Sequence, residues 1–239
     1  YWLSSVSRND LKSFKKYLDK NREKLDKYSQ NIEYKYDITP IIYLPDSKKP
    51  MKVNPNDSFS SIGFFSGNFM SGMFDTFSQM PENRSFFEKQ YDVKAGRWPH
   101  KYDELVLVLS SEGWISDITL YSIGMKDSSK LEAMVNAYMT GGKVEVSNKN
   151  ATFKYDDFIG LEFKLVDSSK YYKYDEEVGV WTDKSGDTEL IKDLIDKGDT
   201  LKIVGVVQAK ADSSVAVLSD GINYTPELTR HVIDMAKDS

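Results

Sequence analysis

Two short, almost uninterrupted apolar runs, far apart in the chain, constrain the fold most strongly. Residues 105–109 read Leu-Val-Leu-Val-Leu, and residues 201–207 read Leu-Lys-Ile-Val-Gly-Val-Val. Runs of this kind, rich in β-branched residues and with little polar alternation, are typical of strands that are buried on both faces. We therefore expect both runs inside a sheet that is covered on two sides.

Helix signals surround these runs. Helices are expected to begin near Ser116, Ser129, Thr188 and Thr225, and the first three to end at Gly124, Gly141 and Gly198. Asp117 and Pro226 then fall in first turns, where an acid complements the helix dipole and proline already has a helical φ. Strands are expected over 32–44, 91–93, 143–146, 152–155, 161–166, 171–174 and 178–181. The order predicts an α+β fold.

The first 29 residues predict one amphipathic, basic helix. Its apolar positions recur at steps of three, four or seven: Leu11, Phe14, Leu18, Leu25 and Tyr28. Eight Lys and Arg against four acids give the segment a charge of +4. This helix either packs on its own domain or forms a stalk near a membrane, with Tyr1 and Trp2 as interfacial aromatics.

Residues 63–80 are too apolar and too rich in glycine for a solvated loop. The segment is either packed over the core, with methionines filling gaps, or an adaptable surface for apolar or peptide ligands. In the second case the binding residues are Phe64, Phe65, Phe69, Met70, Met73 and Phe74.

Composition and missing motifs exclude several kinds of chemistry. The chain has no cysteine and two histidines, so thiol nucleophiles and sites built from several Cys or His ligands are not expected. A net charge of −5 argues against nucleic-acid binding. Phosphate-binding loops and the HExxH and GxSxG motifs are absent, and adjacent acids such as Asp156 and Asp157 do not make a carboxylate pair. We therefore expect no enzyme activity, cofactor or metal.

An ordered series of segments is more specific. It runs through YDVKAGRWP (91–99), DELVLV (103–108), SD (116–117) with LYSIG (120–124), FIGLEFKL (158–165), KIVGVV (202–207) and GINYTP (221–226). This series, over roughly residues 30–226, resembles the extracytoplasmic core domain of ABC transporter permeases of the MacB/FtsX type, particularly in Gram-positive bacteria. The motif residues are Gly96, Arg97, Pro99, Glu104, Asp117, Gly124, Gly160, Gly205 and Pro226.

The resemblance implies an organisation in four parts. Residues 1–29 would form an N-terminal stalk helix, and residues 226–239 a C-terminal one. A porter-like mixed α/β part would comprise 30–110 and 201–225, with a sabre-like part inserted at 111–200. The two stalks would lead to the transmembrane helices of a multi-pass protein, with this domain outside the cell.

The resemblance also implies a non-catalytic function. Stalk motion, driven by a separate cytoplasmic ATPase subunit, would be coupled to export of a peptide, toxin or lipoprotein, or to activation of a cell-wall hydrolase. A second permease copy is a possible partner, and nucleic acid is not expected. Two alternatives stay open: a secreted or lipid-anchored ligand-binding protein with a pocket at 63–80, and a secreted hydrolase that uses carboxylates.

The motif residues have structural explanations of their own. Gly96 would permit a turn before the buried strand, Arg97 would form an ion pair with Glu104 or another acid, and Gly205 would allow close strand packing. Maintenance of the fold, rather than ligand contact, is the role we expect for them.

Overall fold

The computed structural model describes residues 9–29, 31–36, 38–53, 76–127, 153–211, 213 and 217–237. The chain divides into an N-terminal unit (Tyr1–Tyr36) and a main unit (Asp37–Ser239). Among the described residues, no helix is both long and apolar enough to cross a bilayer.

The N-terminal unit contains two helices, α1 (Leu11–Lys20) and α2 (Arg22–Leu25), so the single helix expected over residues 1–29 is wrong. Asp10 begins α1 by accepting a hydrogen bond from the backbone N–H of Ser13. At Asn21 the side chain donates to the carbonyl of Tyr17 at 2.8 Å, and the helix is interrupted there. A side-chain amide that competes for a backbone carbonyl is a local reason for such a break.

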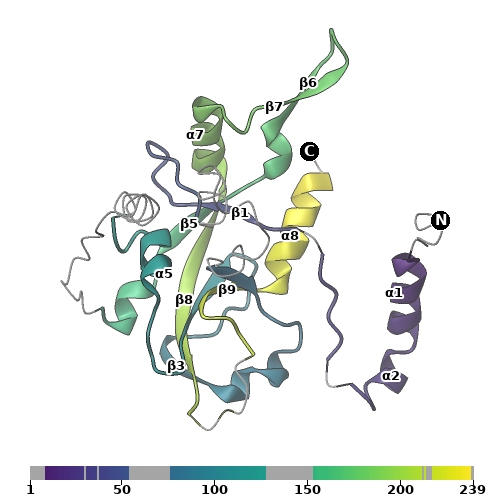
Figure 1. The fold of residues 1–239 in the computed structure, drawn as a ribbon, viewed down its shortest axis with the longest axis vertical. Coiled ribbons are helices and arrows are strands. Elements are labelled where there is room, and N and C mark those ends of the chain that lie inside the picture. The colour runs from purple at the N-terminus through teal and green to yellow at the C-terminus, as the bar shows by residue number, and fades with distance from the viewer. Residues whose placement is uncertain are drawn as a thin grey trace, which may run out of the picture. The chain divides into compact units, whose positions relative to one another are not determined.

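The main unit is built on a curled, mixed seven-stranded sheet (Figure 1). Its strands are β1 (Ile41–Tyr43), β2 (Phe77–Gln79), β3 (Tyr91–Gly96), β4 (Glu104–Leu109), β5 (Glu162–Val166), β8 (Asp199–Ala209) and β9 (Gly221–Tyr224). The order is β1-β5-β8-β4-β9-β2, and β3 also pairs with β8. Long strand β8 pairs antiparallel with β5 and then with β3 on one side, and parallel with β4 on the other.

Both apolar runs lie in interior strands of this sheet, as predicted, but β8 is buried on both faces only over residues 205–207, because Lys202 is exposed and Val204 is half-buried. All six residues of β4 are buried, and their side chains alternate between two hydrophobic clusters. Leu105, Leu107 and Leu109 join the larger cluster, whereas Val106 and Val108 join the second. A strand covered on both faces needs no polar positions, which explains the continuous apolar run.

Three helices cover parts of the sheet: α5 (Asp117–Ser122), α7 (Thr188–Lys197) and α8 (Pro226–Lys237). Leu120 of α5 and Leu228 of α8 belong to the larger cluster, while α7 packs Ile191, Leu194 and Ile195 into a third one. The N-caps are as expected for α5, where the Ser116 hydroxyl accepts from Thr119, and α7 has Asp187 as its cap.

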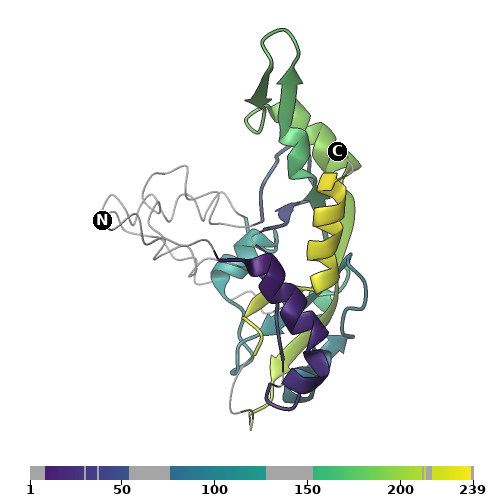
Figure 2. The same ribbon diagram turned by 90° about the vertical axis from the view of Figure 1, so that its right-hand side faces the viewer.

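The described part of the unit also contains short 3₁₀ helices and a hairpin. The 3₁₀ helices are η2 (Arg84–Phe86), η3 (Glu88–Gln90), η4 (Tyr155–Phe158) and η5 (Ser168–Tyr171). β6 (Tyr172–Asp175) and β7 (Val180–Asp183) form a separate two-stranded sheet. Figure 2 shows that this hairpin extends beyond α7, away from the main sheet.

Most of the other expected elements in the described residues are confirmed, with two further corrections. The strand expected over 32–44 is limited to β1, because residues 32–36 belong to the N-terminal unit. The strand expected over 152–155 is wrong: the Asp157 carboxylate accepts the backbone N–H of Lys154 at 2.8 Å and stabilises the 3₁₀ helix η4. The helix from Ser129 and the strand 143–146 lie outside the described residues.

The α+β class is therefore confirmed. The division into porter-like and sabre-like parts stays a prediction. The main sheet includes β5, from the range 111–200, beside β8.

Candidate functional site

Three strands are held together where β3 ends. Gly96 and Gly205 face each other in the register of β3 and β8, and the Arg97 N–H donates to the Val204 carbonyl at 2.9 Å. A Cβ on Gly205 would lie 2.0 Å from the Arg97 carbonyl oxygen, and one on Gly96 would lie 2.1 Å from that of Val204. Gly96 also has a φ of +64°, a conformation that other residues resist. Both glycines are therefore required by this close approach.

An ion pair then joins β3 to β4, as the sequence predicts. The Arg97 guanidinium donates through two nitrogens to both carboxylate oxygens of Glu104, at 2.8 Å for Nη1. The backbone N–H of His100 donates to the same carboxylate at 2.8 Å. The Glu104 side chain is only 10% exposed, and the hydrogen bonds from Arg97 outweigh burial and lower its pKa to about 2. We call Gly96, Arg97, Glu104 and Gly205 the strand tie.

The start of α8 lies close to the strand tie. We call residues 225–231 the foot of α8. Pro226, Leu228 and Thr229 are buried. The Thr225 hydroxyl donates to the Lys101 carbonyl, four residues beyond Arg97, at 3.2 Å, and the Thr225 carbonyl accepts the backbone N–H of Leu228 at 3.0 Å. The Thr229 hydroxyl donates to the Gln79 side chain, which fixes α8 to β2.

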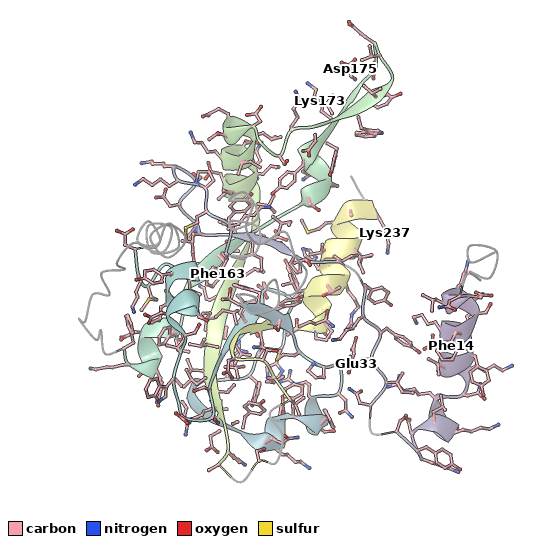
Figure 3. The ribbon with its side chains drawn as sticks, viewed as in Figure 1. Phe14, Glu33, Phe163, Lys173, Asp175 and Lys237 are labelled. Carbon is pink, nitrogen blue, oxygen red and sulfur yellow. The ribbon has the colours of Figure 1, made fainter. Side chains whose placement is uncertain are left out.

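Charged groups on the first two turns of α8 reinforce this attachment. Arg230 lies 2.6 Å from Glu82 and 2.9 Å from Glu227, and Glu82 is the main cause of its raised pKa. His231 Nε2 is 2.7 Å from Asp199 Oδ2 on β8, and its ring stacks on Tyr102 with centroids 3.9 Å apart. The last two residues of α8, Ala236 and Lys237, are by contrast exposed; Figure 3 labels Lys237.

A small cavity of about 60 Å³ lies between the segment that follows Arg97 and the start of α8. It is lined by Met80, Pro81, Glu82, Arg84, Phe87, Trp98, His100, Thr225, Pro226 and Glu227. Arg84 donates to the Pro99 carbonyl at 2.7 Å and lies 3.0 Å from His100 Nδ1. This volume is far below the roughly 300–1,000 Å³ of typical small-molecule sites. Glu82, one of the lining residues, joins two elements through its ion pair with Arg230.

Six of the nine motif residues therefore gather in one region: the four of the strand tie, Pro99 and Pro226. Gly160 is close in the sheet, because its N–H donates to the Ile203 carbonyl of β8 at 2.8 Å. Asp117 and Gly124 lie at the two ends of α5 instead: Asp117 begins the helix and pairs with Lys126 at 2.8 Å, and Gly124 follows its C-cap with a φ of +77°.

The expected ligand surface at Phe64, Phe65, Phe69, Met70, Met73 and Phe74 lies outside the described residues. The pocket proposed there stays a prediction. In the part of the chain that the structure describes, no three His, Cys, Asp or Glu side chains form a group that could hold a metal ion.

Sequence reasoning missed two features. The contact of Tyr102, His231 and Asp199 joins residues that are distant in the chain, and no local pattern indicates it.

The second feature is the apolar surface of the β6–β7 hairpin, which carries exposed Tyr172, Tyr174, Val178, Val180 and Trp181. Its alternation of aromatic and charged residues is visible in the sequence, and it could have indicated an outlying hairpin with an apolar face.

Comparisons with protein-family models, with curated proteins and with solved structures found no match for this chain.

Proposed function

We propose that this chain is the non-catalytic extracytoplasmic domain of an ABC transporter permease of the MacB/FtsX type. In this proposal a cytoplasmic subunit hydrolyses ATP, and the chain couples membrane motion to export or to binding of a partner outside the cell. The sequence motifs are the basis of the proposal, and their arrangement in space supports it.

The observation that carries the proposal is the gathering of motif residues at the foot of α8. Four residues form the strand tie, while Pro226 shares a cavity with Trp98 and His100, which flank Pro99. A motif that maintained only a generic core would be expected to scatter over the sheet. Here six of its nine residues lie near the joint between the sheet and the last helix.

The geometry of α8 fits a lever. Its twelve residues extend about 18 Å, at 1.5 Å per residue. Its first turns are fixed to β2 through Gln79, to β8 through Asp199, and to the loop before η2 through Glu82. A displacement of the exposed end would therefore rotate the sheet with the helix rather than bend the joint.

A labelling experiment tests the proposed location. The parent gene is predicted to encode apolar spans of about 20 residues on both sides of this chain. Because the chain has no cysteine, Lys173→Cys on the exposed hairpin adds one label site to the complete protein. A membrane-impermeant maleimide should label this variant in intact cells, above the level of the unsubstituted protein. Labelling only after lysis would contradict the proposal.

A further inference from the structure

Helix α1 presents an apolar stripe that its own unit leaves uncovered. Leu11 is 68% exposed, Phe14 57% and Tyr17 58%, and none of the residues of α1 is buried. At 100° per residue these three side chains and Leu18 fall on one side of the helix. Lys12, Lys16 and Lys20 fall on the opposite side.

The described residues 31–36 of the N-terminal unit pack beside this stripe, not over it. The chain returns along α1 through residues 31–36, and Figure 3 labels Phe14 on the helix and Glu33 on this return segment. The Tyr34 hydroxyl donates to Asp19 at 2.7 Å, and its ring lies under Lys15, whose Nζ is 4.2 Å from the centroid. Lys15 and Asp19 lie on the polar flank of the helix. The contact therefore orders that flank and leaves the apolar side accessible.

Charge is divided sharply along the chain. Residues 1–29 carry +4, whereas the whole chain carries −5, so residues 30–239 carry −9. Electrostatic attraction to an anionic surface is therefore concentrated in the segment that contains α1. The main unit would be repelled by the same surface.

We propose that α1 lies flat on an anionic lipid surface, with Leu11, Phe14, Tyr17 and Leu18 inserted at the headgroup level. A lysine-rich polar side opposite Leu and Phe is the pattern of helices that lie in the membrane interface. Lysine side chains can extend their ammonium groups to lipid phosphates while their stems stay near the apolar side. The inference goes beyond the proposed function, because it needs neither an ATPase nor a transmembrane stalk.

The size of the stripe favours lipid over a second copy of the chain. A stable protein interface usually buries about 800 Å² on each partner. Four side chains on a ten-residue helix offer much less than that. A membrane adds the attraction of many phosphates to the same small apolar area.

The test uses the 239-residue chain and flotation with two kinds of vesicle, phosphatidylcholine alone and phosphatidylcholine mixed with phosphatidylglycerol. The chain should bind the mixed vesicles, and salt should weaken binding. Leu11→Gln with Phe14→Gln removes apolar area while keeping helix-favouring residues, and should lower the partition coefficient about tenfold or more. Lys12→Glu with Lys16→Glu should also lower it by about tenfold or more, because each lysine near an anionic surface contributes a factor of about five.

Val178→Gln with Trp181→Gln on the hairpin is the matched control, since these side chains are 68% and 67% exposed. This variant should bind as the unchanged chain does. Loss of binding in the hairpin variant alone, equal binding to both kinds of vesicle, or no binding to either would overturn the proposal. Conversion of a dimer to a monomer by the α1 variant, without any lipid binding, would assign the stripe to a second copy instead. All outcomes are read on the isolated chain, so they are independent of the labelling in cells.

Discussion

At the scale of single residues, the ion pair of Arg97 and Glu104 should stabilise the fold mainly because the Glu104 carboxylate is buried. Arg97→Gln leaves a carboxylate that is 10% exposed with its backbone donors but without its cation. We expect the free energy of unfolding to fall by about 1–3 kcal/mol, measured by urea denaturation. Lys237→Gln breaks a pair with Asp234 that is 67% exposed on both sides, and should cost less than about 0.5 kcal/mol. Equal losses in the two variants would contradict this account of the strand tie.

The same pair predicts an acid-dependent loss of stability. Arg97 holds the pKa of Glu104 at about 2, below its ordinary 4.5. Since the folded-state pKa is the lower one, the ionised carboxylate stabilises the fold fully above about pH 4.5. That contribution, at most about 3 kcal/mol, is lost as the pH falls toward 2. Denaturation curves recorded down to about pH 3 should show a shallower pH dependence in Glu104→Gln than in the unchanged chain. Curves of identical slope would be inconsistent with the pair.

Gly205 is constrained by the neighbouring backbone. Gly205→Ala places a methyl group 2.0 Å from the Arg97 carbonyl oxygen, so the β3–β8 pairing must shift. We expect a loss of about 2 kcal/mol or more in thermal or chemical unfolding. Gly186→Ala is the control, because a Cβ there meets nothing within 4 Å, and should change stability by less than about 1 kcal/mol. A mild effect at both glycines would mean that the strands are not held this closely.

At the scale of the element, α8 should be attached mainly through its first half. Leu228 is fully buried in the larger cluster, whereas Met235 packs against that cluster only partly buried. Leu228→Ala should lower the free energy of unfolding by about 2–5 kcal/mol, and Met235→Ala by about 1 kcal/mol, both by urea denaturation. Similar losses at the two positions would show that the helix is held along its whole length, which weakens its description as a lever.

Local sequence signals predict the ends of an element well where a single residue determines that end. The bounds of α7 are predicted correctly, and the N-cap of α5 is Ser116 as expected, since cap residues act within one turn. The apolar runs of β4 and β8 also indicate burial on both faces. The break of the first helix at Asn21 is not predicted, because heptad spacing continues past it. The Asp157 turn is missed because strand-like aromatics surround it.

At the scale of the whole molecule, the sequence predicts the α+β class and the Arg97–Glu104 pair. It does not predict that Tyr102 meets His231, or that the foot of α8 contacts β2 through Thr229 and Gln79. Such contacts join residues far apart in the chain, and they depend on how the sheet curls. The sequence therefore predicts which residues belong to the candidate site, but it does not predict most of the contacts between them.

The central claim is that the joint between β9 and α8 transmits motion between membrane and sheet. Its most direct test is a flexible Gly-Ser insertion between Thr225 and Pro226 in the complete transporter, with transport and ATP hydrolysis both measured. The same insertion between Glu177 and Val178, in the turn of the β6–β7 hairpin, is the control. The account predicts that transport is lost while ATP hydrolysis and the amount of protein in the membrane persist, and that the hairpin insertion leaves transport intact. Full transport with a flexible β9–α8 joint would contradict it.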